Sequence, residues 1–337
     1  MKMERKVILV FGLSFFLAGL LYYSNFPIAS SQSVTVVSKL VDKAPADDPN
    51  AAIWSQASPI DVPLSAQLIT KPRVFEAHVR KVRVRSLMDG NTISFLLEWE
   101  AQKPSMDLIK HEDFRDAVAI QFPVNKDEPR PYFCMGQEDG AVNIWHWKAD
   151  WEQDLAGFKD INDTYPNMAA DNMKSMIGEQ NAPYPSGPYQ NELQPDSEIY
   201  LTGKGAGNMF SDAGLRKSPI ENLVAGGFGT LTTSNIQNVQ GKGIYSDGKW
   251  KVVFSRDINT EDEEVARFTP NKFQPIAFAV WNGAEGDRDG MKSVSSWYWM
   301  VPEGKTNAIT FLLPIGAMAL VGAGEYFLLK RRKRREK

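Results

Sequence analysis

Two segments of the sequence carry side chains that could bind a redox-active metal group. In the first, FCMGQEDGAVNIWHWKADW (residues 133–151), Met135 precedes a glycine and is followed by three tryptophans. A methionine thioether is a competent axial ligand for haem iron, and apolar or aromatic walls keep water from the macrocycle. From these residues alone, the simpler interpretation is a buried core methionine beside structural tryptophans, because methionine commonly fills apolar gaps.

The second segment, AVWNGAEGDRDGMKSVSSWYW (residues 279–299), holds Lys292 in a glycine- and charge-rich loop between two aromatic strands. A lysine amine binds iron only when it is neutral. It therefore needs a desolvated pocket, or the metal itself, to lower its pKa. Taken by itself, Lys292 reads as a solvated surface lysine.

The cysteine and histidine counts restrict the metal chemistry. Cys134 is the only cysteine, which excludes an intrachain disulfide, a cysteine-ligated iron–sulfur cluster and the two-cysteine attachment of c-type haem. No two of the histidines His78, His111 and His146 have the spacing of a usual zinc site. The cysteine count agrees with a haem that is bound without covalent attachment.

Charge and motifs argue against two other classes of function. The formal net charge is −3, of which the first six residues carry +2 and the last eight carry +6, so the part between them carries −11. An acidic domain argues against nucleic-acid binding. Glu98, Glu100 and Asp150 could be drawn as an acid–base pair, but no spacing selects them, and no nucleophile-elbow or phosphate-loop motif appears. A hydrolase is therefore disfavoured.

The elements that would position these residues read mainly as short strands. Residues 92–99 (TISFLLEW) and 250–255 (WKVVFS) place large apolar side chains at alternate positions, as strands do. Asp89-Gly90 and Asp247-Gly248 precede these strands and favour antiparallel hairpins. Short strands without regular helices between them predict a mainly β fold, an antiparallel β-sandwich. Further strands are expected at 117–122, 276–281 and 296–301.

Both ends of the chain combine an apolar segment with basic residues. Ala308–Leu329 contains one ionisable residue, Glu325, and as a helix would reach about 33 Å, enough to cross the hydrocarbon of a membrane. The positive-inside rule keeps the following KRRKRREK in the cytoplasm and the preceding domain outside. MKMERK before the apolar run 7–23 gives the same orientation. We therefore expect a signal peptide or N-terminal membrane anchor at 1–31, an extracytoplasmic domain at 32–306, a transmembrane helix at 307–329 and a basic cytoplasmic tail at 330–337.

Read together, the two segments resemble the haem-binding γ subunit of the ethylbenzene dehydrogenase type. This subunit accompanies periplasmic molybdenum enzymes of the dimethyl sulfoxide reductase family. The similar blocks keep the family order from about Asp47 to Trp299, so they cover most of the predicted outer domain. Besides the two segments above, the blocks are DDPNAAIW (47–54), VPLSAQLITKPR (62–73), ISFLLEWE (93–100), FRDAVAIQFP (114–123), LVAGGFGTLT (223–232) and GKGIYSDGKWKVVFSR (241–256).

The resemblance implies one b-type haem, bound non-covalently between the sheets of a β-sandwich by a methionine and a lysine. The matching positions are Met135, in the Met-Gly step, and Lys292, in the Gly-Met-Lys-Ser step. His146 is a fallback ligand, but its alternation with two tryptophans places it on the opposite strand face, which favours a solvent- or partner-facing role. The candidates for the pocket wall are Trp145, Trp147 and Trp281.

The resemblance also implies a function in electron transfer. The haem would exchange single electrons between a molybdenum and iron–sulfur oxidoreductase and another redox carrier, with no substrate-transforming site in this chain. The C-terminal apolar segment departs from soluble family members. It favours a membrane-anchored version, such as those of nitrate reductases or nitrite-oxidising enzymes, or an independent membrane cytochrome. The alternative is a cofactor-free, membrane-tethered β-sandwich that binds a glycan or a protein through exposed aromatic residues.

Overall fold

Fourteen strands joined in one sheet form most of the structure. The computed structural model describes residues 35–69, 71–124, 130–159, 161–167, 207–210, 212–260, 265–305 and 308–335. The strands are β1 (Thr35–Leu40), β2 (Ile60–Pro63), β3 (Ser65–Ala66), β4 (Lys81–Met88), β5 (Thr92–Glu100), β6 (Ala117–Pro123), β7 (Val142–Lys148), β8 (Ile220–Ala225), β9 (Thr232–Thr233), β10 (Gln240–Ser246), β11 (Lys249–Asp257), β12 (Gln274–Trp281), β13 (Ser293–Val294) and β14 (Tyr298–Pro302). The helices are η1 (Ala52–Gln56), α2 (Ala149–Ala156), α3 (Ile161–Thr164), η3 (Ala213–Leu215), η4 (Gly283–Glu285) and α5 (Ala308–Arg335).

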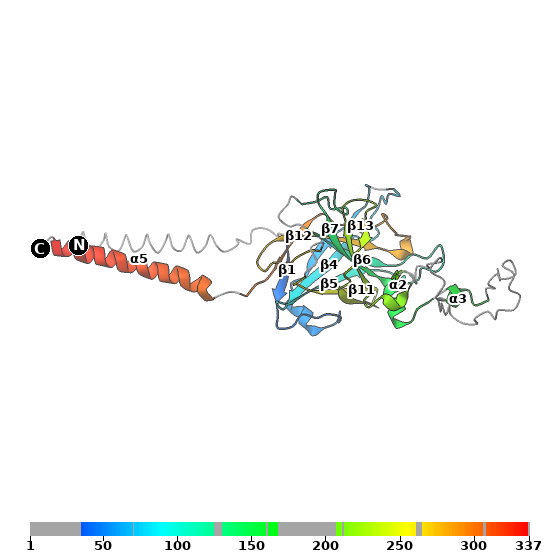
Figure 1. Ribbon diagram of the computed structural model, residues 1–337, viewed down its shortest axis with the longest axis horizontal. Coiled ribbons are helices and arrows are strands. Elements are labelled where there is room, and N and C mark those ends of the chain that lie inside the picture. Colours follow the sequence, from blue (N-terminus) through cyan, green and yellow to red (C-terminus); the bar gives the residue numbers. More distant parts are fainter. Residues whose placement is uncertain are drawn as a thin grey trace, which may run out of the picture. The chain divides into compact units, whose positions relative to one another are not determined.

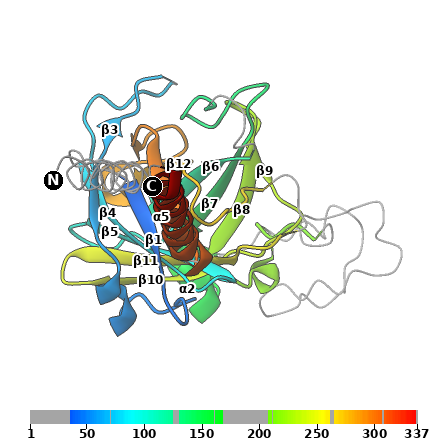
Figure 2. The ribbon, with the colours of Figure 1, turned by 90° about the vertical axis from the view of Figure 1, so that its left-hand side faces the viewer.

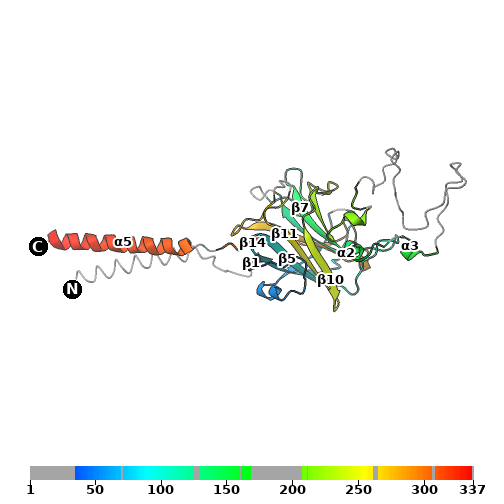
Figure 3. The same ribbon diagram turned by 60° about the horizontal axis from the view of Figure 1, so that its bottom comes forward.

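The sheet folds over itself into two layers, as the prediction of a mainly β sandwich requires. Its strand order is β10-β11-β5-β4-β1-β14-β12-β6-β7-β8-β9. The first layer holds β10, β11, β5, β4 and β1. Of these, β10, β11, β5 and β1 are labelled in Figure 3, where this layer faces the reader. The second holds β12, β6, β7 and β8, which lie together in Figure 2 (Figure 1 gives the labels). Strand β14 connects the two layers.

The expectation of an entirely antiparallel sheet is wrong at β1. This strand runs parallel to both of its neighbours, β4 and β14. Parallel neighbours require a long crossover connection, and residues 41–80 between β1 and β4 provide one that contains η1, β2 and β3. The sheet is therefore mixed rather than antiparallel throughout.

The two predicted hairpins are confirmed. Strands β4 and β5 pair across Asp89-Gly90, and β10 and β11 pair across Asp247-Gly248. Asp247 has φ of 52° and Gly248 has φ of 73°. Two consecutive residues with positive φ give the turn whose twist matches antiparallel strands. The two hairpins join through β5 and β11, in a register that places Trp250 opposite Trp99 and Phe254 opposite Phe95.

The space between the layers is filled by one large apolar core. Trp145 packs edge-on against Phe122, with ring centroids 5.0 Å apart, and Trp147 packs edge-on against Trp250 at 4.8 Å. Pairs of this kind add about 0.5–1.5 kcal/mol to the burial of their rings. The opposite face of the second layer carries a separate, smaller apolar cluster, which includes Ala117, Ala119 and Trp281.

A buried carboxylate directly before the start of β6 connects the two layers. Asp116 is fully buried and accepts hydrogen bonds from the Ser105 backbone N–H (2.8 Å), the Gly283 backbone N–H (2.9 Å) and the indole of Trp250 (2.8 Å). Burial raises the pKa of Asp116, and these three donors oppose the rise. The carboxylate thus holds the segment after β12 in place, and that segment leads into one wall of the site described below.

The C-terminal segment is helical but does not meet the prediction made for it. Helix α5 covers most of the predicted span at 307–329 and continues into the basic tail. Among the residues that the structure describes, no helix has the length and apolar character needed to cross a membrane, so the predicted transmembrane helix is not supported. The predicted signal peptide or anchor at 1–31 lies outside the described residues.

Candidate functional site

A pocket of about 860 Å³ lies on the face of the second layer that points away from the core. Alternation along the strands creates it, because successive side chains of a strand point to opposite faces. In β6, Val118 and Ile120 enter the core, whereas Ala117, Ala119 and Gln121 line the pocket. Its volume is at the upper end of the range for small-molecule and cofactor sites, about 300–1,000 Å³.

Small side chains form the floor of this pocket. Ala119 of β6 pairs with Ala279 of β12, and Ala277 and Ala117 lie on the same two strands. All four line the pocket. Methyl groups in neighbouring strands make a low, apolar surface, over which a flat ligand has room to lie.

Met135 lies in one wall of the pocket, in the loop between β6 and β7. It has φ of 70°, and Gly136 after it has φ of 79°. A Cβ at Gly136 would lie 2.6 Å from the carbonyl oxygen of Gly140 and 3.0 Å from that of Ala225, so only glycine fits there. The Met-Gly step that the sequence singled out is therefore a tight turn that presents the methionine side chain to the pocket.

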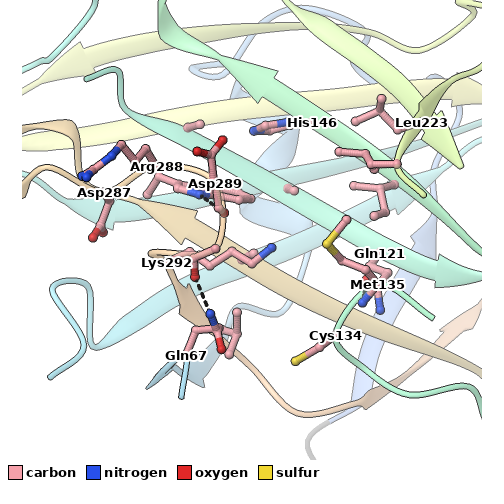
Figure 4. Close-up of a pocket in the computed structure, with 18 of the residues that line it drawn as sticks. Gln67, Gln121, Cys134, Met135, His146, Leu223, Asp287, Arg288, Asp289 and Lys292 are labelled. Carbon is pink, nitrogen blue, oxygen red and sulfur yellow. Dashed lines mark hydrogen bonds between the residues drawn. The ribbon is translucent and has the colours of Figure 1, made fainter. Parts of the chain in front are cut away.

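Lys292 lies in the opposite wall, in the loop between β12 and β13. Its amine is 4.9 Å from the ring centroid of Trp281. Figure 4 shows the amine pointing toward the side chain of Met135. Burial lowers the pKa of Lys292, and the nearby Cys134 and Asp289 partly oppose this decrease. The pocket therefore favours the neutral amine more than water does, and a neutral amine is the form that can bind a metal.

His146 lines the same pocket, contrary to the solvent- or partner-facing role expected for it. Its ring stacks on Trp281, with centroids 4.8 Å apart. Its Nε2 is buried, and no hydrogen-bond partner is found for it among the described residues. Burial lowers the pKa of His146 well below its ordinary value, and the charges of Lys148, Arg115 and Lys292 act in the same direction. The imidazole is therefore neutral at pH 7.

One end of the pocket contains a buried ion pair between Lys148 and Glu221, each with a side chain 2% exposed. Burial lowers the pKa of Lys148 to about 8, although Glu221 opposes this. The amine also lies 3.9 Å from the ring centroid of Trp151, and the hydroxyl of Thr233 donates to Glu221 at 2.6 Å. Each charge already has partners, so the pair closes this end of the pocket without offering a free ligand.

The structure brings some of the predicted site residues together and separates others. Met135, Lys292 and Trp281 line one pocket. Trp145 and Trp147 instead belong to the core between the layers, on the other face of β7. The pocket is accordingly on the outer face of the second layer, and not between the sheets as the resemblance implied.

Sequence reasoning missed the alanine floor, and it named His146 only as a fallback ligand on the face expected to meet solvent or a partner. The signal was present in the strands themselves, where 117–121 (AVAIQ) and 277–281 (AFAVW) place alanine on one face and large apolar residues on the other. In β7 the rule of alternation was applied correctly, but the face that carries the tryptophans was assigned to the pocket. The size of the side chains distinguishes the two faces. Large side chains fill a close-packed core, whereas small side chains leave room for a ligand.

Comparison with known proteins identifies relatives over most of the chain. The ethylbenzene dehydrogenase family model matches residues 51–293. A protein of Haloferax mediterranei, named provisionally as a respiratory nitrate reductase heme subunit, is 25% identical over 87% of this chain and 82% of its own length. The chlorate reductase subunit gamma of Ideonella dechloratans is 23% identical over 76% of this chain and 79% of its own length. The dimethylsulfide dehydrogenase subunit gamma of Rhodovulum sulfidophilum is 38% identical over 25% of this chain and 35% of its own length.

Among solved structures, a family 9 carbohydrate-binding module from Caldicellulosiruptor kristjanssonii in complex with glucose covers 82% of this chain and 98% of its own. The identity is 10% and the TM-score is 0.37. A likeness at this level carries no argument about the site.

The burial of Cys134 in the Met135 loop predicts an unreactive thiol. Burial raises the pKa of Cys134 to about 11, and the charge of Lys292 opposes this only in part. We expect iodoacetamide at pH 8 to alkylate the native protein at least about 100-fold more slowly than the urea-unfolded chain, because the thiolate is the reactive species. The native rate should rise as the pH approaches 11. Mass spectrometry of timed samples measures both rates, and similar rates in the two states would contradict this burial.

Proposed function

This chain belongs to the ethylbenzene dehydrogenase family, and we propose that its β domain binds one haem b non-covalently and uses it for electron transfer. The observation that carries the proposal is the pair of donors on opposite walls of one pocket, Met135 and Lys292, above a floor of alanines. The name of the Haloferax mediterranei relative, a heme subunit, supports the same cofactor.

The residues present fit a haem in size and in chemistry. The pocket has a volume of about 860 Å³ and a largely apolar lining, which suits a flat macrocycle and keeps water from it. A thioether sulfur and a neutral amine are both competent axial ligands of haem iron. In this arrangement Met135 and Lys292 would hold the iron, and Trp281 would form part of the wall.

The neighbouring titratable groups favour these two ligands. Burial weakens the hold of Lys292 on its proton, so the amine becomes available at a lower pH than in water. Burial has the opposite effect on Cys134, whose pKa of about 11 keeps the thiol protonated at pH 7. A protonated thiol is a poor metal ligand. The loop therefore offers the sulfur of Met135 rather than that of the adjacent cysteine.

The bound haem would supply reversible one-electron chemistry, and the protein would supply its ligands and its dry surroundings. We propose that the electrons pass between the iron–sulfur and molybdenum subunits of an oxidoreductase and another redox carrier. The support is that the similar proteins bear the names of subunits of a nitrate reductase, a chlorate reductase and a dimethylsulfide dehydrogenase. The partner's substrate would be transformed in the partner.

We also propose that the domain works on the extracytoplasmic side of the cell membrane. The support is the basic MKMERK directly before the apolar run 7–23 of the sequence, the arrangement of a signal peptide or N-terminal anchor. Protease added to intact spheroplasts should then digest the domain without prior lysis. A domain that is protected in spheroplasts and digested only after lysis would place it inside.

The first prediction of the haem proposal concerns the spectrum of the purified protein. Protein from a haem-replete host should show the reduced bands of a b-type haem. Met135→Ala and Lys292→Ala should each convert low-spin to high-spin features, because each would remove one of the proposed ligands of the iron. Trp147→Phe, in the core, is the matched control and should keep the wild-type spectrum. Haem-free wild-type protein would contradict the proposal, and unchanged spectra in both alanine variants would reject these ligands.

A second prediction tests the alanine floor. Ala119→Phe places a ring where the macrocycle would lie, so we expect haem content to fall at least about tenfold. The side chain faces the pocket and not the core, so the melting temperature of the haem-free protein should change by no more than a few degrees. Ala156→Phe, at an exposed position of α2, is the control and should bind haem normally. Full haem content in Ala119→Phe, measured by the pyridine haemochrome, would show that haem lies elsewhere.

A further inference from the structure

We infer that two buried glutamines, Gln121 and Gln67, are positioning residues that hold the Met135 and Lys292 loops at the separation that the iron requires. This inference rests on the proposed haem function. Gln121 is 8% exposed and Gln67 is 2% exposed. A glutamine amide has both a donor and an acceptor, so one side chain can fix two backbone groups of a loop at once.

Gln121 holds the loop of Met135 from below. Its Oε1 accepts the backbone N–H of Met135 at 3.2 Å, and its Nε2 donates to the carbonyl oxygen of Phe133 at 2.8 Å. These two bonds span the residues that turn into the positive φ of Met135. The residue itself is anchored in β6, where it pairs with Ala277 on one side and Ile144 on the other. The rigid sheet thus fixes the turn that carries the sulfur.

Gln67 holds the loop of Lys292 through both its side chain and its backbone. Its Nε2 donates to the carbonyl oxygen of Gly290 at 2.7 Å, and its backbone N–H donates to the carbonyl oxygen of Lys292 at 3.2 Å, the bond drawn as a dashed line in Figure 4. Its Oε1 also accepts the backbone N–H of Ile69. The strand β3 just before it pairs with β13 just after Lys292, in the register Ala66 to Ser293. The hydrogen bonds of Gln67 therefore extend the pairing of β3 with β13 to the Lys292 loop.

The two loops have no direct contact that would set their separation, as far as the described hydrogen bonds show. The Met135 loop is instead tied to β6 by the amide of Gln121 and to the indole of Trp297 through the carbonyl oxygen of Pro131. The Lys292 loop is tied to the segment after β3 by the side chain and the backbone N–H of Gln67, and to β12 by the indole of Trp281, which donates to the carbonyl oxygen of Asp289. If an amide is lost, a buried backbone N–H or carbonyl oxygen loses its partner, and the loop gains freedom to satisfy it elsewhere. The ligand on that loop would then be held less firmly, although the residue that binds the iron is unchanged.

The test uses the haem-loaded protein with Gln121→Leu and Gln67→Leu. For Gln121→Leu, imidazole should displace the methionine sulfur from ferric haem at an about tenfold lower concentration, because two backbone groups lose their hydrogen bonds. The loss of the sulfur-to-iron charge-transfer band reports the displacement. Gln121→Glu retains the acceptor for the Met135 N–H and should fall between Leu and wild type. For Gln67→Leu, the single low-spin ferric EPR species should split into more than one.

Gln237→Leu is the matched control. Gln237 is also a loop clamp, which accepts the N–H of Asn222 at 2.8 Å and donates to the carbonyl oxygens of Asn222 and Ser234, but it holds neither ligand loop. It should lower the melting temperature and leave the imidazole midpoint and the EPR spectrum unchanged.

The outcomes separate this inference from the proposed function. A wild-type protein that binds no haem overturns the proposed function. A wild type that binds haem through Met135 and Lys292, with Gln121→Leu, Gln121→Glu and Gln67→Leu all behaving like Gln237→Leu, overturns the positioning role alone. If Gln121→Leu fails to fold, Gln121→Glu decides: an imidazole midpoint equal to that of the wild type rejects the role of Gln121, and a lowered midpoint supports it.

Discussion

The site depends on one constraint, that a β-strand offers its two faces to different environments. In β6, β7 and β12, one face must fill the space between the layers and the other must leave space outside them. The large residues, such as Trp145 and Trp147, meet the first demand because interiors are close-packed. The alanines meet the second. A register shift of one residue would exchange the two faces and destroy core and pocket together.

The two proposed ligands lie in loops, and the fold restrains those loops in three ways. Gly136 permits a turn that a Cβ would block. Asp116 holds the segment after β12 through the N–H of Gly283. Gln121 and Gln67 connect the two ligand loops to strands. Loops are ordinarily the most variable part of a domain, so this degree of backbone restraint is what turns two separate side chains into one site.

Part of this arrangement can be read from the sequence. Alternation and the Asp-Gly turns predict the hairpins of β4–β5 and β10–β11, and the Met-Gly and Met-Lys steps identify two residues that lie in one pocket. The parallel pairing of β1 could not be read, because it depends on a crossover that leaves no local signal. The side of the sheet on which the pocket opens could not be predicted either, because both faces of β7 carry aromatic or apolar residues. His146, expected to face solvent or a partner, lines the pocket, and Trp147, expected in the pocket wall, lies in the core.

The central claim is that Met135 and Lys292 bind the iron of one haem in this pocket. X-ray absorption at the iron edge of the purified protein tests it most directly, because sulfur and nitrogen ligands scatter differently. We expect one sulfur ligand at the iron of the wild-type protein, and we expect it to disappear in Met135→Ala and to persist in His146→Phe. A first shell of nitrogen alone in the wild type, altered by His146→Phe, would contradict it and would make His146 the ligand in place of Met135.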